Sequence, residues 1–383
     1  MIRTIFTLGV GAILICAGVE SSKAQAPVIK VEAGESVSVA IQSSGELAGI
    51  LKNNFMIHGA INVVEANRAD FIIAAAAGSG GVEGSVKSAT GATRLTRMTM
   101  GDLRKAAHEF TDAVIQELTG RPGIATSQVV FVSNQSGHKE IYLMDMDGER
   151  VRQITRDQSI SLGPKFSPDG GRIAFTSYKS GHPDVWVIDL ARSTKKAVAF
   201  FPGVNSGASF SPDGSRLALT LSKDGNTDLY TMPAGGGDPV RLVRTRGTEA
   251  SPVWSPNGQQ ILFVSDDRGA PQLFIIPATG GSMERLQTFS SYTTEPTWSP
   301  DGTKVAYSLM TAGQSQIGMT DLRTKEQTVL TAGGSHESPS WARDSRHLVY
   351  SKGGQLFLCD TLTKKTSRLT SRISGCTEPN VSL

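Results

Sequence analysis

Nine residues, TEPTWSPDG at Thr294–Gly302, contain the motif that decides the fold of this chain. An aromatic residue is followed by Ser-Pro-Asp-Gly, in which proline presets φ for a tight turn and glycine completes that turn. The motif occurs at Phe166, Phe210, Trp254 and Trp298, and in a degenerate form, WARDS, at Trp341. These aromatic residues are 44, 44, 44 and 43 residues apart. Such a period is typical of propeller blades, each of which is a four-stranded antiparallel sheet.

The last eight residues, CTEPNVSL at Cys376–Leu383, match the start of that motif and then stop. Upstream of Phe166, an incomplete repeat supplies only the second, third and fourth strand-like segments, at Gln128–Ser133, Glu140–Asp145 and Val151–Thr155. A blade without its first strand would leave backbone N–H and C=O groups unpaired. The sequence therefore predicts a mostly β protein with a six-bladed β-propeller over residues 123–383, in which the C-terminal strand closes the first blade.

Residues 25–122 lack the repeat and read as a small α/β domain in front of the propeller. Alternating and helical apolar patterns predict the following elements: strands at Val28–Val31, Val37–Ile41, Ile61–Val64, Phe71–Ala75, Val82–Lys87 and Thr93–Thr99, and helices at Glu46–His58 and Asp102–Leu118. Gly120 and Pro122 stop the second helix. Because this helix leads directly into the first blade, we expect a short and stiff junction between the two domains.

Residues 1–24 have the pattern of a cleaved export signal. Arg3 gives a positive start, Ile5–Val19 is an apolar run, and Ser22-Lys23-Ala24 offers small residues for cleavage. The run is shorter than the ~20 residues that a membrane-spanning helix needs. Lipid attachment at Cys16 is an alternative, although Ile15 before it fits that modification poorly. The sequence thus predicts an exported protein and leaves the cleavage position open.

Composition narrows the possible partners. A formal net charge of +3 is too small to favour nucleic acid or an anionic membrane, and we expect a monomer. Cleavage would leave two cysteines, Cys359 and Cys376. Export permits a disulfide between them. Cys359, however, occupies a repeat position that apolar residues hold in other blades, so it is first interpreted as a core residue, and the pairing stays open.

The sequence predicts a protein without catalytic chemistry. A Gly-x-Ser-x-Gly elbow and a His-Glu-x-x-His metal motif are both absent from it. DMDGER at Asp145–Arg150 lacks the spaced ligands of an EF-hand and is interpreted as a plain turn between strands. We therefore expect neither an enzyme nor a cofactor or metal site, and leave open whether an ion binds in the channel.

One rim of the propeller channel is the predicted partner-binding site. The loops expected before the innermost strands open on that rim, and four of them contain glutamate. The predicted contacts are Asn205, Gly207, Glu249, Thr294, Glu295, His336, Glu337, Thr377 and Glu378. Glu295 and Glu378 share one register. An acidic rim would suit a protein partner with basic or amide groups; the alternative is that solvated loops simply carry glutamate.

The chain resembles the TolB family, the periplasmic components of the Tol–Pal system of Gram-negative bacteria. The resemblance rests on the SPDG blades, NTDLY at Asn226–Tyr230 and TEPTW at Thr294–Trp298. In the front domain it rests on ILKNNFMIHGAINVV at Ile50–Val64 and AAHEFTDAVIQELTG at Ala106–Gly120. It extends over nearly all of the chain that follows the export signal.

The resemblance implies a binding protein that helps to maintain the outer membrane and to constrict it at cell division. TolB-like proteins dock the peptidoglycan-associated lipoprotein Pal at the channel mouth, and Glu295 matches a family contact position. Val204 and Ala208 depart from the family pattern in their blade. A TolA-like inner-membrane protein would bind the segment from Gln25 to about Gly34. The alternatives are a ligand-binding or sensor propeller and a related protein outside the Tol–Pal system.

Overall fold

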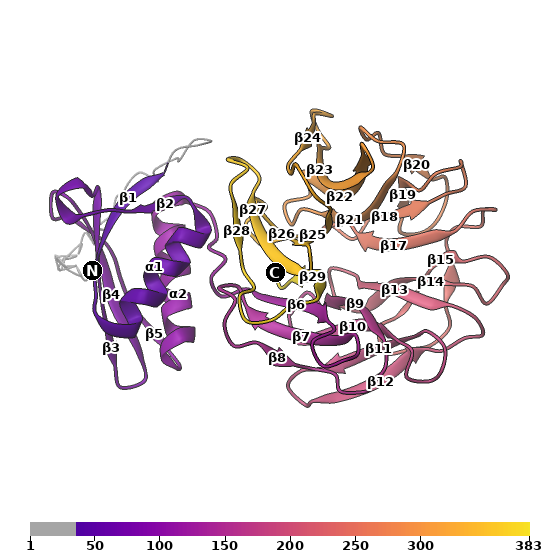
Figure 1. The fold of residues 1–383 in the computed structure, drawn as a ribbon, viewed down its shortest axis with the longest axis horizontal. Helices are drawn as coiled ribbons and strands as arrows, with labels where there is room; N and C mark the ends of the chain where they lie inside the picture. The colour runs from indigo at the N-terminus through magenta and orange to yellow at the C-terminus, as the bar shows by residue number, and fades with distance from the viewer. Residues whose placement is uncertain (1–35) are drawn as a thin grey trace, which may run out of the picture.

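The structure is a computed structural model that describes residues 36–383. The predicted export signal, the strand expected at Val28–Val31 and the segment Gln25–Gly34 lie outside the described residues. The described chain forms a small α/β unit beside a ring of six four-stranded sheets (Figure 1). Within residues 36–383, no helix combines the length and the hydropathy that crossing a membrane requires.

The α/β unit is a five-stranded sheet with both helices on one face. Its elements are β1 (Val37–Gln42), α1 (Gly45–His58), β2 (Ile61–Val63), the short 3-10 helix η1 (Ala66–Arg68), β3 (Phe71–Gly78), β4 (Gly81–Ser88), β5 (Thr93–Met100) and α2 (Leu103–Thr119). The strand order is β2-β1-β3-β4-β5, with β1 parallel to β2 and β3. The helices and strands predicted between residues 37 and 118 are all confirmed.

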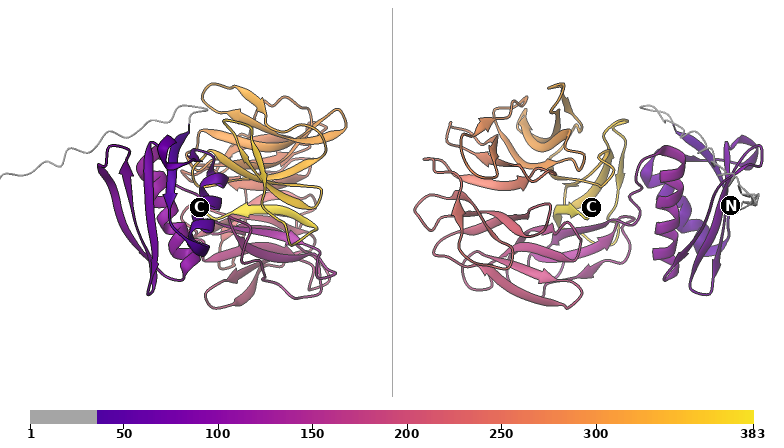
Figure 2. Two further views of the ribbon diagram at one scale, coloured as in Figure 1. Left: turned by 60° about the vertical axis from the view of Figure 1, so that its left-hand side comes forward. Right: turned by 180° about the vertical axis from the view of Figure 1, so that it is seen from behind.

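Helices α1 and α2 lie between that sheet and the propeller (Figures 1 and 2). Their apolar faces pack on the sheet through fully buried residues such as Leu51, Phe55 and Phe110. Asp102 caps the start of α2 by accepting a hydrogen bond from the Lys105 N–H. Gly120 ends that helix in the left-handed conformation, as its position after the apolar stripe predicts.

Six sheets form the propeller, and each has its innermost strand at the channel. The first blade contains β6 (Gln128–Ser133), β7 (Glu140–Asp145), β8 (Arg152–Gln153) and β29 (Cys376–Val381). The second and third contain β9 (Ser161–Phe166), β10 (Arg172–Ser177), β11 (Asp184–Asp189), β12 (Thr194–Ala199), β13 (Asn205–Phe210), β14 (Arg216–Leu221), β15 (Asp228–Pro233) and β16 (Val240–Arg241). The fourth contains β17 (Glu249–Trp254), β18 (Gln260–Ser265), β19 (Gln272–Pro277) and β20 (Glu284–Arg285). The fifth and sixth contain β21 (Thr293–Trp298), β22 (Lys304–Thr311), β23 (Gln314–Asp321), β24 (Gln327–Val329), β25 (His336–Trp341), β26 (His347–Lys352), β27 (Gln355–Asp360) and β28 (Thr366–Arg368).

The C-terminal strand closes the ring, as predicted. The first blade has the strand order β29-β6-β7-β8, with Val381 opposite Val129 and Cys376 opposite Ser133. In Figure 1 the yellow end of the chain lies beside the purple β6. Asn380 ties this strand to both neighbouring blades, because its side chain accepts from the Phe166 N–H and donates to the Ser340 hydroxyl.

The motif aromatic residues pack between blades. Trp254, at the end of β17, lies in a cluster with Leu229 of the third blade and Phe263 of its own blade. Arg216 covers the Trp254 ring from the third blade. Trp298 is in the same way packed against Leu273 of the preceding blade. The period of 44 residues therefore places one apolar wedge at each of these joints.

Hydrogen bonds within the Ser-Pro-Asp-Gly turn explain why the motif recurs. The Ser167 hydroxyl donates to the Asp169 carboxylate and accepts from the Arg172 N–H, so one side chain holds both ends of the turn. Equivalent bonds recur in the third, fourth and fifth blades, through Ser211, Ser255 and Ser299, with the Asn257 amide oxygen in place of the carboxylate in the fourth. Gly170 has φ +69°, which favours glycine at that position.

Cys359 and Cys376 are both buried free thiols. Cys359 is 1% exposed and packs in the core of the sixth blade, which confirms its interpretation as a small apolar core residue. Burial raises the pKa of each thiol to about 12, so both are protonated at neutral pH.

The junction between the two domains is short and held by one carboxylate. Asp112 of α2 accepts hydrogen bonds from the Ala125 N–H at 2.7 Å, the Thr126 N–H at 3.0 Å and the Thr126 hydroxyl at 2.6 Å. Arg343 of the sixth blade lies 3.7 Å from the same carboxylate. This contact network agrees with the stiff junction that the sequence predicts.

Candidate partner-binding site at the channel mouth

A β-bulge in every innermost strand shapes the channel mouth. The third residue of each of these strands has a positive φ between 50° and 66°, and the strand register shifts at this point. These six residues, the bulge ring, are Gly163, Gly207, Ser251, Glu295, Ser338 and Glu378. The next residue is proline in five blades and Ala208 in the third. Proline suits this position because a bulge leaves one residue without a ladder partner.

The bulge corrects the sequence interpretation of these segments. They were expected to be loops before the innermost strands, but the structure shows that they are the first halves of those strands. Side chains in them therefore alternate between the channel and the blade joints. Whether a residue faces the mouth depends on its place relative to the bulge.

Two glutamates stand in the bulge ring at a conformational cost. Non-glycine residues with positive φ are uncommon, and such a conformation costs on the order of 1–3 kcal/mol. Glycine occupies the same ring position in the second and third blades, so the fold accepts glycine there. Glu295 and Glu378 keep the strained position instead, each with its carboxylate at the mouth. Strain of this kind makes the bulge ring a candidate functional site.

The mouth is a cavity of about 270 Å³. It is lined by the six residues of the bulge ring, by Lys165 and Val253, and by Pro252, Pro296, Pro339 and Pro379. Prolines thus give an apolar floor around the two carboxylates. Such a combination of apolar surface and a few fixed polar groups is typical of a binding site.

Each of the two glutamates clamps the next blade. Glu295 accepts hydrogen bonds from the Ser338 N–H at 2.8 Å, the Ser338 hydroxyl at 2.7 Å and the Ser308 hydroxyl at 2.7 Å. Glu378 accepts from the Gly163 N–H at 2.6 Å. Burial raises the pKa of Glu378, although the Gly163 N–H opposes this effect. These bonds fix both carboxylates, and each still has lone pairs for a partner.

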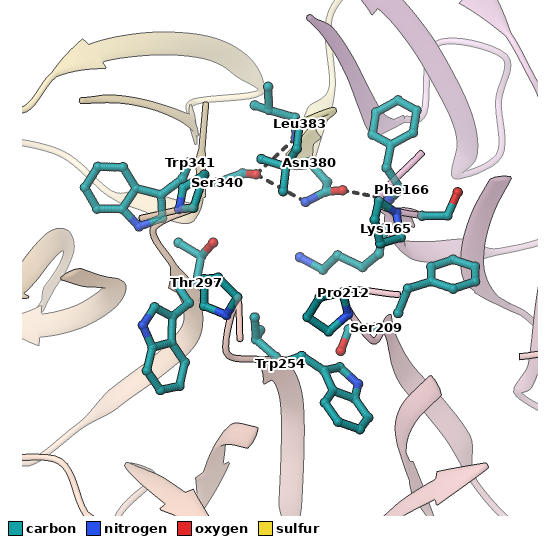
Figure 3. A pocket seen from close by; sticks show the side chains of 18 residues that line it. Lys165, Phe166, Ser209, Pro212, Trp254, Thr297, Ser340, Trp341, Asn380 and Leu383 are labelled. Carbon is teal, nitrogen blue, oxygen red and sulfur yellow. Dashed lines mark hydrogen bonds between the residues drawn. The ribbon is translucent and has the colours of Figure 1, made fainter. Parts of the chain in front are cut away.

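Lys165 is the positively charged residue that lines the channel. It precedes Phe166 in β9 and lines both the mouth and a second cavity of about 330 Å³ on its other side. Figure 3 shows its side chain pointing into the middle of the channel. No hydrogen bond or ion pair joins it to another residue of 36–383. Burial lowers the pKa of its ammonium group, and the carboxylates of Glu295 and Glu378 partly oppose that change.

Three predicted rim residues are buried at the starts of their strands instead. Glu249 is fully buried and accepts from the hydroxyls of Thr245 and Ser265. Asn205 is fully buried and donates to the backbone oxygens of its own loop. His336 packs against Tyr350. Their burial does not support a direct contact with a partner, so the acidic rim is narrower than the sequence indicates.

The other predicted residues lie at or beside the mouth. Gly207 belongs to the bulge ring and lines the cavity. Thr294 and Thr377 each precede a ring glutamate and are half-buried, and Glu337 is exposed. Partial desolvation of its carboxylate, together with the charge of Glu295, raises the pKa of Glu337. That any of these residues binds a partner stays a prediction.

Sequence reasoning missed Ser251, Ser338, Lys165 and Asn380. A signal for them exists, because every ring residue stands three positions before the motif aromatic residue or its equivalent, Val381. Lys165 and Asn380 stand one position before it. Counting back from that residue would have identified both sets.

The second cavity opens toward the Ser-Pro-Asp-Gly turns. It is lined by the motif aromatic residues and by Pro168, Pro212, Pro256 and Pro300, with Leu383 at its edge. Figure 3 shows that the rings of Trp254 and Trp341 point away from the channel axis, whereas Lys165 points into it. Lys165 and Val253 line both cavities.

Comparisons with curated proteins find short stretches of clear similarity. Over 69 residues the chain is 51% identical to "Tol-Pal system protein TolB" of Geobacter sulfurreducens, covering 18% of this chain and 16% of that protein. Over 96 residues it is 41% identical to "Protein TolB homolog" of Chlorobaculum tepidum, covering 24% and 22%. The matched stretches thus span only about a fifth of these relatives' length.

Solved structures resemble the chain over a much larger part of its length. TolB from Acinetobacter baumannii matches with a TM-score of 0.82 at 23% identity, covering 93% of this chain and 98% of that structure. The tricorn protease matches with a TM-score of 0.53 at 19% identity, covering 64% of this chain and 26% of the other. At these identities the likeness concerns the fold alone.

The family model described as "TolB beta propeller domain" matches residues 115–382. This range contains all six blades, including the C-terminal strand that closes the first. The matched range is more than half of the chain, which is sufficient to establish the family. The chain belongs to the TolB β-propeller family.

Proposed function

We propose that this chain is a periplasmic adaptor of the Tol–Pal system, acting by binding rather than catalysis. Its channel mouth docks a Pal-like, peptidoglycan-associated lipoprotein and so supports outer-membrane integrity and constriction at division. The observation that carries the proposal is the pair of strained glutamates in the bulge ring. A fold that accepts glycine there keeps two fixed carboxylates at an apolar mouth instead.

The charge distribution of the mouth supports a polar protein surface as the ligand. Glu295 and Glu378 are arranged to accept hydrogen bonds from basic or amide groups. Lys165, deeper in the channel, offers a donor to a partner carbonyl or carboxylate. A partner segment that enters the mouth would therefore meet acceptors first and a cation behind them. The export signal that the sequence predicts in residues 1–24 supports the periplasmic location, and Gln25–Gly34 would bind a TolA-like protein.

A second candidate function is a ligand-binding or sensor propeller. The cavity of about 330 Å³ beside Lys165 favours it, because its proline-rich lining and single cation would suit a small anionic molecule. Recovery of a small molecule with purified protein, and of no lipoprotein from envelope extract, would favour this candidate.

Reversing the charge of one ring glutamate is expected to weaken lipoprotein binding at least about tenfold, which corresponds to about 1.4 kcal/mol. Glu295→Lys places a cation where the partner is expected to present donors, so a like charge opposes docking. The measurement is calorimetric titration with the Pal-like lipoprotein of the same organism, together with thermal unfolding of each variant.

Glu295→Gly tests the contribution of the carboxylate to binding without disturbing the fold. It removes the carboxylate but suits the left-handed backbone, as Gly163 and Gly207 do at equivalent positions. We expect intermediate binding and a melting temperature close to that of the original chain. Glu326→Gln, an exposed site at the outer edge of the same blade, is the matched control. Unchanged affinity in Glu295→Lys would refute the proposed docking mode.

A further inference from the structure

A second cluster of possible metal ligands, distinct from the channel mouth, lies where the α/β unit meets the sixth blade. His58 is the last residue of α1, and Asp344 and His347 lie in the degenerate WARDS turn and at the start of β26. All three are buried. One possible ligand atom from each lies within 4.8 Å of those of the other two. This group, the junction triad, has no part in the channel site.

Distances within the junction triad suit a small divalent cation. The Nε2 atom of His58 lies 3.7 Å from Oδ2 of Asp344, which is too long for a hydrogen bond. Two donors on one tetrahedral zinc ion, with bonds of about 2.0–2.1 Å, are roughly 3.3 Å apart. Nδ1 of His347 is hydrogen-bonded to the same Oδ2 at 2.6 Å, and a bound metal would replace this hydrogen bond. The two imidazole ring centroids are 5.1 Å apart.

Three of the four imidazole nitrogens of the triad have no hydrogen-bond partner; the exception is Nδ1 of His347, which is bonded to the Asp344 carboxylate. His58 is 1% exposed, and neither of its ring nitrogens has a hydrogen-bond partner. Nε2 of His347 is also buried without one. Buried polar atoms are nearly always paired, so orphaned nitrogens that face a carboxylate require an explanation.

Neighbouring groups orient the Asp344 carboxylate and neutralise the charge of Arg346, the nearest cation. Oδ1 of Asp344 accepts from the N–H groups of Arg346 and His347, both at 3.0 Å, and thereby orients Oδ2. The Arg346 guanidinium forms two hydrogen bonds with Asp360, at 2.9 and 2.6 Å. Its charge is thus already compensated. A groove of about 450 Å³ between the domains is lined by Ile57, Gly59 and Arg346, which are sequence neighbours of the triad residues.

A similar group at the same interface is a weaker candidate. His108 lies beside Asp145 and Asp147. Arg104 and Asp147 already form a salt bridge, however, and Arg150 approaches Asp145. Nδ1 of His108 is bonded to Asn54. These carboxylates therefore already have cations, whereas the carboxylate of Asp344 has only the imidazoles and its backbone donors.

We propose that His58, Asp344 and His347 bind one zinc ion that fastens the α/β unit to the propeller. Two imidazoles and one carboxylate form a donor set that zinc accepts, with water in the fourth position. The ligands come from both domains, so the ion binds only when the domains are docked. Zinc binding therefore stabilises the docked arrangement.

Metal binding is tested on the purified chain, which is stripped of metal with a chelator, reloaded with zinc and then freed of unbound zinc. We expect one zinc ion per chain by elemental analysis and a melting temperature that rises with added zinc. Cobalt(II) alone, used as a probe, should give the visible absorption of a tetrahedral site. Absence of both stoichiometric zinc and the cobalt spectrum would overturn the proposal, and this outcome needs no variant.

Single variants then assign the ligands. His58→Ala and His347→Ala are each expected to weaken zinc affinity by at least about 10–100-fold. This is the loss that follows when a residue that only hydrogen-bonds to a metal ligand is removed. His138→Ala, at an exposed site far from the junction, is the control and should leave affinity unchanged. Circular dichroism confirms that each variant is folded. If a folded His58→Ala variant binds zinc as the original chain does, the assigned site is wrong; if a variant does not fold, the cobalt spectrum of the original chain decides.

Discussion

Deleting Pro379–Leu383 is expected to lower the melting temperature of the whole propeller by roughly 10–20 °C. The deletion removes Val381, which is buried between the first and sixth blades, and burial of such a side chain contributes about 1.5–3 kcal/mol. It also removes the Asn380 bridge to Phe166 and Ser340. Each of these hydrogen bonds contributes about 1 kcal/mol.

Further bonds at the very end of the chain add to the loss. The Gln128 N–H donates to the Ser382 hydroxyl, and the Ser382 N–H donates to the Gln128 carbonyl. The total is on the order of 5 kcal/mol, comparable with the whole stability of many domains. Because the deletion opens the ring at its only covalently interrupted blade, we expect one cooperative transition at the lower temperature.

Calorimetry of the truncated chain measures this effect. The control is removal of Leu383 alone, because this residue is exposed and forms no ladder pair. We expect that shorter deletion to change the melting temperature by no more than about 2 °C. A truncated chain that lacks Pro379–Leu383 yet melts like the original would show that the C-terminal strand does not hold the ring together.

Asp112→Ala is expected to reduce the free energy of unfolding by about 3 kcal/mol and to loosen the junction between the domains. The Asp112 carboxylate accepts two N–H groups and one hydroxyl from Ala125 and Thr126, at the entry to the first blade. Each hydrogen bond to a charged group contributes about 1.5–3 kcal/mol. In the variant, water would hydrogen-bond to some of the freed donors, so the expected loss is smaller than the sum of the three bonds. Removing the carboxylate leaves these donors without an acceptor.

Hydrogen exchange detects the loosening directly. The amides of Ala125 and Thr126 should exchange faster in Asp112→Ala, while amides in the fourth blade should not change. Gln116→Ala lies on the exposed face of the same helix and is the matched control. Equal protection of Ala125 and Thr126 in the variant and the original chain would rule out the carboxylate as the clamp of the junction.

Most of the fold could be predicted because its determinants lie within short segments of the sequence. The Ser-Pro-Asp-Gly turn depends on residues within one short segment, as the Ser167 hydroxyl shows, and it recurs at a fixed period. The period identified the blades, and the match between Cys376–Leu383 and Thr294–Gly302 identified the closing strand. The apolar stripe and stop signals of α2 were equally local. All of these predictions are confirmed.

The candidate site was only partly predictable. Glu295 and Glu378 were recognised by their shared register, but Glu249 was placed on the rim and is buried at the start of β17. The difference arises from the bulge, which turns the third residue of each innermost strand toward the mouth. Without the bulge, strand alternation gives no reason to separate Glu249 from Glu295.

The sequence alone determined the number of blades, their strands and the closure of the ring, because turn chemistry and apolar spacing act within one repeat. Only the tertiary structure decided which side chains meet across repeats and across domains. His58 is nearly three hundred residues from Asp344 and His347, and no linear motif joins them. Their convergence follows from the docking of α1 on the sixth blade, a contact between distant segments that depends on the shape of both folded domains.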